Sequence, residues 1–309
     1  MSLSIGLKNQ KYAKKTKNML KYVGCMINTE KIERLIQLTI TSGYVKDKEA
    51  PLSIILLGES ESGKTKIINK FDNKHLLEIS DLSQKPIVDM LISALVEDKI
   101  HHILIPDLVK VLSHNVPTTQ ATIAFLNALM DEGIKSQMFF NMQFKLKKRV
   151  KCGLITSCTF DYYYKVFRNW HDIGFLTRFL PVSFIYSEDT IIEINHQIAQ
   201  DNYFFEKMKL NSIKKETITI PKDISEKIEF LVQQIITKQS NESIRITTQG
   251  GKQKMISFKR YGFRFHKQIR KLLQSIALIN GRIVCTYEDL NELLSLIDYI
   301  RLPKNPKVL

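Results

Sequence analysis

The sequence is short of cysteine, of glycine and of acidic side chains, and it has no long apolar run. Its four cysteines form no CxxC pair and have no histidine near them at ligand spacing. This scarcity argues against a disulfide framework or a zinc site and favours a reducing compartment. No span approaches the ~20 apolar residues of a membrane helix, and the first apolar run is too short for a signal peptide. We therefore expect a cytoplasmic protein without membrane association.

The shortage of acid leaves a large positive charge. The chain has 46 Lys and Arg against 31 Asp and Glu, a formal net charge of +15. Such an excess favours a nucleic-acid partner, because neutralising phosphates supplies most of non-specific affinity. A general bias towards Lys, Ile and Asn is the alternative. The lysines of residues 8–21 also have two interpretations: they contact a phosphate backbone, or they belong to a solvated terminus.

The pattern along the chain indicates three parts. Residues 1–50 combine the basic segment with a helix near 29–45. Residues 51–195 alternate buried strands with helices, the strands falling at 52–58, 101–108, 152–158 and 179–187. Buried strands separated by helices predict an α/β fold with a parallel sheet covered on both faces, in three layers. Residues 196–309 read as helical, with Thr286 and Asp289 forming a capping box.

The stretch LLGESESGKTKII, residues 56–68, contains the pattern GxxxxGK[ST] between a buried strand and a helix. Its glycines let the backbone N–H groups wrap a phosphate chain. Lys64 is expected to reach the β- and γ-phosphates of ATP, and Thr65 to bind Mg²⁺. A surface glycine loop without a ligand is the alternative. The expected nucleotide-binding residues are Gly58, Glu59, Ser60, Glu61, Ser62, Gly63, Lys64, Thr65 and Lys66.

An acidic residue is needed, in addition to Thr65, to hold the metal. Asp107, which closes the strand ILIPD, fits this role, although an ordinary strand-end turn residue is the other interpretation. Leu108 stands where an acidic residue often follows to activate water. Either Glu132 or Asp131 supplies that carboxylate from elsewhere, or hydrolysis is weak.

The stretch DIGFLTRFLPVSFIY, residues 172–186, resembles the arginine box of AAA+ ATPases, especially of the minichromosome-maintenance-like helicase clade. The resemblance implies an AAA+ core with a helical C-terminal lid, assembled as a homo-oligomeric ring, a hexamer in that clade. It implies that Arg178 reaches the γ-phosphate held by a neighbouring subunit and neutralises charge in the transition state. A helix-end arginine that caps carbonyls or pairs with a carboxylate is the alternative.

Two further segments carry the resemblance. CGLITSCTFD lies where the family has its polar sensor strand, which implies that Ser157 or Thr159 orients the attacking water; the usual asparagine is absent. Residues 264–297 resemble the lid, which implies that Arg264, or else Arg260, touches the γ-phosphate within its own subunit. A plain amphipathic helix would explain this segment equally. The resemblance covers residues 51–190 and 222–300.

The stretch MFFNMQFKLKKRVK, residues 138–151, alternates apolar and polar side chains and predicts a β-hairpin with one basic face. Helicases of the resembled clade project a lysine-bearing hairpin from this point into the central pore, where it would follow a DNA backbone. A charged edge strand is the alternative. The expected DNA-contacting residues are Lys145, Lys147, Arg149 and Lys151.

Two functions follow as expectations. The first is an ATP-hydrolysing ring that translocates on DNA as a helicase or replication motor. The second is a loader or switch that binds ATP and recruits replication proteins with little hydrolysis, which the missing acidic residue after Asp107 favours. A protein-remodelling ATPase is less well supported, since the sequence has no aromatic-hydrophobic-glycine pore loop.

Overall fold

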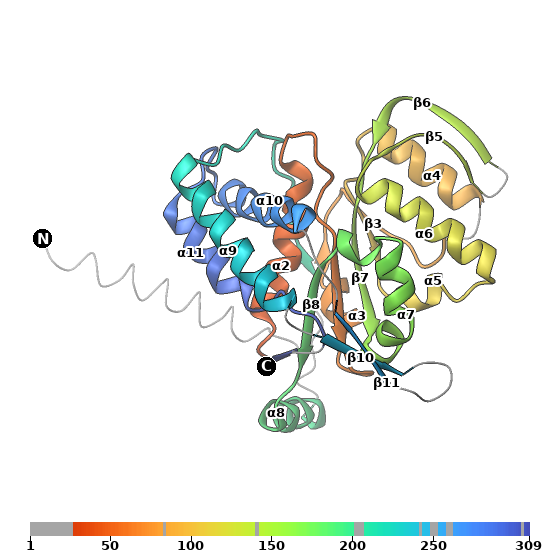
Figure 1. Ribbon diagram of the computed structural model, residues 1–309. Helices are drawn as coiled ribbons and strands as arrows, with labels where there is room; N and C mark the ends of the chain where they lie inside the picture. Colours follow the sequence, from red (N-terminus) through yellow and green to blue (C-terminus); the bar gives the residue numbers. More distant parts are fainter. Residues whose placement is uncertain are drawn as a thin grey trace, which may run out of the picture.

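A six-stranded, fully parallel sheet forms the centre of the protein (Figure 1). The structure is a computed structural model that describes residues 27–82, 85–139, 142–200, 207–240, 243–247, 253–257, 262–303 and 306–309. The strand order is β12-β8-β1-β7-β4-β3. The strands are β1 (Ile54–Gly58), β3 (Leu76–Glu78), β4 (His102–Ile105), β7 (Gly153–Thr159), β8 (Leu180–Ile185) and β12 (Lys307–Val308).

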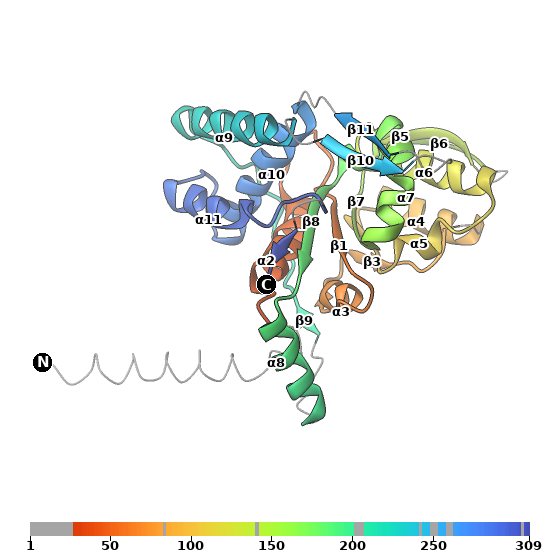
Figure 2. The same cartoon turned by 60° about the horizontal axis from the view of Figure 1, so that its bottom comes forward.

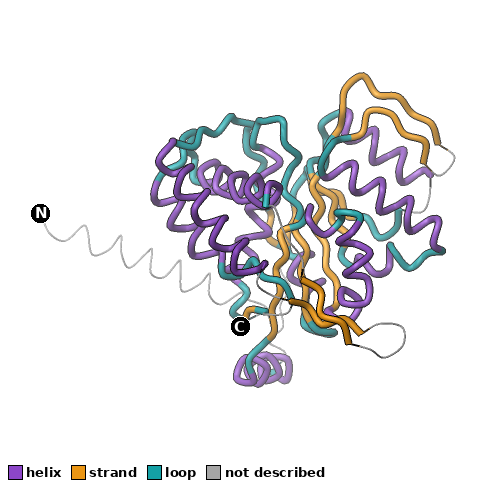
Figure 3. The backbone as a smooth tube through the Cα atoms, viewed as in Figure 1, coloured by secondary structure: helices purple, strands orange, loops and turns teal. Residues whose placement is uncertain are grey.

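Helices cover both faces of the sheet, as the sequence predicts (Figure 3). Side chains alternate along β1, so that Ile54 and Leu56 enter one hydrophobic cluster while Ile55 and Leu57 enter the other. The second cluster is closed by α4 (Lys85–Val96), α5 (Leu108–Val111), α6 (Val116–Met130) and α7 (Phe160–Asp172). The three-layer α/β architecture is therefore confirmed.

The first cluster joins the two ends of the described chain. It contains α2 (Glu30–Thr41), α3 (Lys64–Asn69), α9 (Lys222–Ser240), α10 (Phe263–Ile279) and α11 (Tyr287–Ile297). Leu35 of α2 and Leu272 of α10 are both fully buried in it. The amino-terminal helix and the C-terminal helices thus form one layer on the sheet, rather than two parts with separate cores. The predicted capping box of Thr286 and Asp289 is present at the start of α11.

Two hairpins extend from the layers. β5 (Ile134–Phe139) and β6 (Met142–Val150) form the hairpin that the alternation predicts, and it packs along α4. β10 (Ser243–Thr247) and β11 (Gln253–Ser257) form a second hairpin, in a part that the sequence predicted to be helical. The region predicted to be helical from residue 196 onward is interrupted early, since α8 (Glu188–Ala199) ends at Ala199 and β9 (Met208–Lys209) pairs with β2 (Phe71–Asp72).

Because its strands are parallel, the central sheet has two unlike edges. The carboxyl edge is where the strands end, at Gly58 of β1 and Thr159 of β7; the amino edge is where they begin, beside Ser53 and Arg178. In open α/β sheets ligands bind outside the carboxyl ends of the strands. None of the helices in the described part of the chain has the length and hydropathy needed to cross a bilayer.

Candidate nucleotide site and arginine cluster

The loop between β1 and α3 has a backbone that favours glycine at two positions. Gly63 has a φ of +73° directly before α3. A Cβ on Gly58 would lie 2.9 Å from Ser62 Oγ and 3.3 Å from the carbonyl oxygen of Phe184. Ser62 Oγ donates to the carbonyl of Glu59 at 2.9 Å, and Tyr186 Oη donates to the carbonyl of Ser62 at 3.2 Å. The loop is therefore closely wound and tied to β8, as a phosphate-binding loop requires.

Lys64 turns its ammonium group back into this loop. Its Nζ donates to the carbonyl of Gly58 at 3.2 Å, to Ser62 Oγ at 3.1 Å and to the carbonyl of Glu59. Burial lowers the pKa of Lys64, against the attraction of Asp107 and Glu59. A partly desolvated cation inside a loop of backbone amides attracts phosphate more strongly than one in water. Thr65 and Lys66 are exposed in the first turn of α3.

Asp107 lies beside the loop, where the sequence predicts it. The register joins Ile55 to Thr156 and Thr156 to Ile105, so Asp107 follows β4 two residues beyond this row. Its Oδ1 accepts from the backbone N–H of Val109 at 3.0 Å and caps α5, while the residue stays exposed. Leu108 is fully buried in the core and does not face the loop. Asp107 is therefore both a turn residue and a carboxylate available to a metal ion.

Ser157 and Thr159 also reach the carboxyl edge, in different settings. Ser157 is buried, and its Oγ donates to the carbonyl of Pro106 at 2.6 Å, which fixes the turn that carries Asp107. Thr159 pairs with Gly58 in the register and caps α7 by accepting from the N–H of Tyr162 at 3.4 Å. Between them, Cys158 has its pKa raised to about 12, by burial first and then by Asp107. The structure thus brings residues 58–66, Asp107, Ser157 and Thr159 together.

Glu132 lies at the other edge of the sheet, so its predicted role at the phosphate loop of its own chain is wrong. It follows α6, which starts after the carboxyl end of β4 and runs back to the amino edge. The five residues of β1 alone separate the edges by on the order of 15 Å. Glu132 is exposed there, and its carbonyl accepts from Arg149 at 3.3 Å. Asp131, the other candidate, is engaged by two arginines at this edge.

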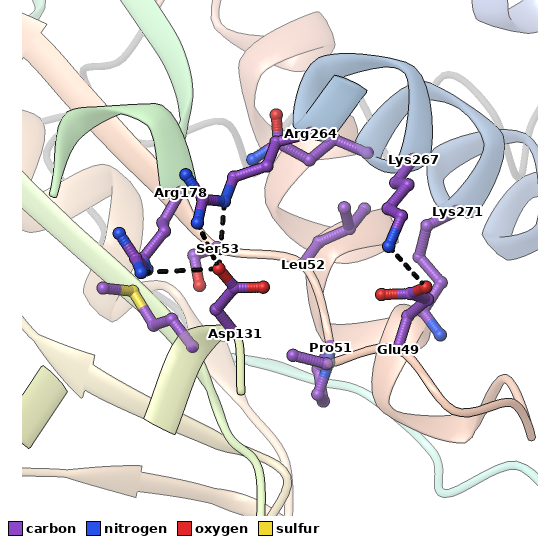
Figure 4. A pocket seen from close by; sticks show the side chains of 12 residues that line it. Glu49, Pro51, Leu52, Ser53, Asp131, Arg178, Arg264, Lys267 and Lys271 are labelled. Atoms are coloured by element: carbon purple, nitrogen blue, oxygen red, sulfur yellow. Dashed lines mark hydrogen bonds and ion pairs between the residues drawn. The ribbon is translucent and has the colours of Figure 1, made fainter. Parts of the chain in front are cut away.

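Arg178 is one of these two arginines (Figure 4). It ends the short η3 helix (Leu176–Arg178) directly before β8. Its Nη1 donates to the carbonyl of Gly174 at 2.6 Å, and its Nη2 lies 3.4 Å from Asp131 Oδ2. Its side chain is 10% exposed, and burial, followed by the nearby Arg264, lowers its pKa. Arg178 lines a pocket at the amino edge and is too far from its own phosphate loop to act there.

Arg264, in the first turn of α10, is the second arginine. Its Nη2 and Nε donate to Asp131 Oδ2 at 2.6 and 2.9 Å, and its Nη1 donates to Thr177 Oγ1 at 3.2 Å. The prediction that Arg264 touches the nucleotide of its own subunit is therefore wrong for this arrangement. Helix α10 presents it to the amino edge, beside Arg178. Arg260 lies outside the described residues.

The β5–β6 hairpin carries part of the predicted basic face. Lys147 and Arg149 are exposed, and so is Lys148 between them, so the alternation does not continue to the end of β6. Arg149 donates to the carbonyls of Glu132 and Gly133 at 3.3 Å, and Lys151 donates to the carbonyl of Lys48 at 2.8 Å. The side chain of Lys145 lies outside the described part.

The aromatic side chains of α7, after β7, belong mostly to the core. Tyr163 and Trp170 are buried, and Trp170 packs edge-on against Phe175 with ring centroids 5.2 Å apart. The histidine of β4 is structural as well. His102 Nε2 donates to the carbonyl of Leu52 at 3.2 Å, and burial lowers its pKa to about 3.

Comparison with known proteins adds no family to these observations. No family model matches the chain, and no curated protein matches it. Within the described ranges, no group of three or more His, Cys, Asp or Glu side chains is placed to hold a metal ion by itself. Thr65 and Asp107 can therefore serve a metal only together with other ligands, such as the phosphates of a nucleotide.

Proposed function

We propose that the protein binds ATP with Mg²⁺ at the carboxyl edge of its sheet. The observation that carries this proposal is the wound loop of residues 58–63 with the buried ammonium of Lys64 inside it. Asp107 lies on the adjacent strand end, and Thr65 is exposed at the start of α3. Lys64 would hold the β- and γ-phosphates, while Thr65 and Asp107 would hold the metal.

We further propose that catalysis is shared between subunits of a ring. Arg178 and Arg264 lie at the amino edge, opposite the phosphate loop, so a guanidinium can reach a γ-phosphate only on another copy. A contact that joins unlike edges of two copies is heterologous, and it closes into a ring when the rotation permits. The resemblance of residues 172–186 to the AAA+ arginine box supports the same arrangement.

The preferred activity is ATP-driven translocation on DNA, as a helicase or replication motor. The net charge of +15 and the exposed Lys147, Lys148 and Arg149 on the β5–β6 hairpin support a polyanionic track. These side chains would follow phosphates without reading sequence. The resemblance to minichromosome-maintenance-like helicases supports this reading of the hairpin.

One observation favours a second function, an ATP-dependent switch or loader that recruits replication proteins. Leu108 is buried where an acidic residue would activate water, and Asp131 and Glu132 lie at the wrong edge to replace it. Slow hydrolysis would then set how long the ATP-bound assembly lasts, rather than drive movement along DNA.

ATP turnover with and without single-stranded DNA separates the two functions. A motor gives turnover that DNA stimulates, whereas near-zero turnover independent of DNA identifies the switch. We expect Lys64→Ala to lose binding of an ATP analogue, and Arg178→Ala to keep binding but lose turnover. Arg168→Ala, which removes a guanidinium 70% exposed on α7, is the matched control and should retain both. Full analogue binding by Lys64→Ala would contradict the nucleotide site itself.

A further inference from the structure

Helix α8 projects from the body of the protein beyond the carboxyl edge (Figures 1 and 2). Among the described residues its anchoring hydrogen bonds lie at its start, where Ser187 N and Thr190 Oγ1 both donate to the carbonyl of Leu309 at 2.9 Å and Asn28 Nδ2 donates to Thr190 Oγ1 at 3.3 Å. Thr190 is its one buried residue. The rest of the helix therefore contributes little to the described core.

The projecting helix nevertheless carries large apolar side chains. Ile191, Ile192 and Ile198 are 46%, 67% and 48% exposed. Ile191, Ile194 and Ile198 follow helical spacing and share a face, and Ile192 extends this face on the side of Ile191. Isoleucine is among the residues most often fully buried, and exposed apolar groups rimmed by polar ones mark interaction sites. The helix is also acidic, with Glu188, Asp189 and Glu193, and α8 has no Lys or Arg.

A cleft of complementary character lies at the amino edge, next to the arginine cluster. Its volume is about 550 Å³, and its apolar lining includes Leu176, Phe179, Phe265 and Ile300. Phe263 stands at this cleft with 76% of its surface exposed. The cleft lining includes the cations Arg264 and Lys267 and the carboxylate of Asp131, with which Arg264 pairs at 2.6 Å. The cleft thus combines apolar walls with a small net positive charge, and α8 combines an apolar face with acidic side chains.

We propose that α8 of one copy docks into this cleft of the next copy. The helix leaves one edge of the sheet and the cleft opens at the other, so the two meet only in a head-to-tail assembly. This is the assembly that also brings Arg178 to a neighbouring phosphate loop, and the inference rests on that part of the proposed function. The occupant is a second copy of this chain, on the grounds of charge, polarity and position.

The docked helix is directly linked to the nucleotide loop of its own chain. Tyr186, two residues before α8, donates its hydroxyl hydrogen to the carbonyl of Ser62 at 3.2 Å. A change in the loop on nucleotide binding therefore reaches the base of α8 through one hydrogen bond.

Cysteine cross-linking between two differently marked copies tests the contact. Cys152, Cys158 and Cys285 are buried, and a Cys25→Ser background removes the remaining thiol. Ile192→Cys and Phe263→Cys chains are treated with a short bismaleimide, each alone and mixed, with ATP analogue present. We expect a cross-linked dimer in the mixture that is absent from either chain alone. Ile192→Cys mixed with Ile283→Cys, an isoleucine 61% exposed elsewhere, is the control pair. Equal cross-linking in the two mixtures overturns the proposal.

A charge placed on α8 provides the second test. Mass photometry of the full chain should show at least tenfold weaker association for Ile192→Asp and wild-type association for Ile283→Asp. Ile192→Asp should still bind the ATP analogue, whereas Lys64→Ala should not, which separates failure of this contact from failure of the nucleotide site. Undiminished association of Ile192→Asp, or a wild-type chain that stays monomeric with nucleotide, contradicts the docking of α8.

Discussion

Asp107 caps a helix and offers a carboxylate to the nucleotide site, and the two roles can be separated. Asparagine caps helices about as well as aspartate, but it has no negative charge. We predict that Asp107→Asn changes the free energy of unfolding by less than about 0.5 kcal/mol, while the gain in ATP-analogue affinity on adding Mg²⁺ is lost.

The comparison variant is Asp107→Ala. It should also lose the gain in ATP-analogue affinity on adding Mg²⁺, and its free energy of unfolding should fall by about 1 kcal/mol, because the cap to Val109 is removed. Urea unfolding and analogue titrations with and without Mg²⁺ measure both quantities. An Asp107→Asn protein with an intact response to Mg²⁺ would exclude Asp107 from the metal site.

Single residues could be predicted from the sequence where a short local pattern fixes them. Lys64 and Asp107 lie where the loop and the strand end place them. Glu132 and Arg264 could not be located, because long helices carry them away from the strand ends. The 15 residues of α6 span about 22 Å, enough to move Glu132 from one edge of the sheet to the other.

At the scale of elements, the start of α11 links stability to pH. Burial would raise the pKa of Asp289, but hydrogen bonds from Arg282, the Thr286 N–H and Asn280 outweigh it and lower that pKa. A lowered carboxyl pKa contributes stability above the unfolded value of about 4, and this stability is lost as pH falls through the folded value.

We therefore predict that the wild-type protein loses stability below pH 4 more steeply than Asp289→Asn does, and that the variant is less stable at pH 7. Thermal unfolding followed from pH 7 to pH 3 measures the difference. Glu288→Gln, at an 83% exposed position that also meets Arg282, is the control and should follow the wild-type curve. Parallel curves for wild type and Asp289→Asn would refute this assignment.

Elements were predictable in proportion to their length and burial. β1, β4, β7 and β8 read as buried apolar runs, whereas β3 and β12 have three and two residues and leave no pattern. The β10–β11 hairpin had a usable signal that was missed, since the alternating stretch SIRIT is followed by a Gly-Gly pair.

The arrangement of the whole molecule places the two halves of the proposed active site at opposite edges of one sheet. The common direction of the strands decides this, because Arg178 precedes β8 whereas the glycine loop follows β1. The order of the strands is left open by a sequence of buried strands, because each crossover can return to either side. The joining of α2 with α9, α10 and α11 in one cluster was equally beyond local patterns, since it depends on contacts between distant segments.

The measurement that tests shared catalysis most directly is ATP turnover by a mixture of two inactive variants. Lys64→Ala keeps the arginine cluster, and Arg178→Ala keeps the phosphate loop. In an equal mixture, about a quarter of the head-to-tail contacts pair an intact loop with an intact arginine. We predict that turnover reappears on mixing, at roughly that fraction of the wild-type rate. A mixture as inactive as either variant alone would contradict an active site completed by the neighbouring subunit.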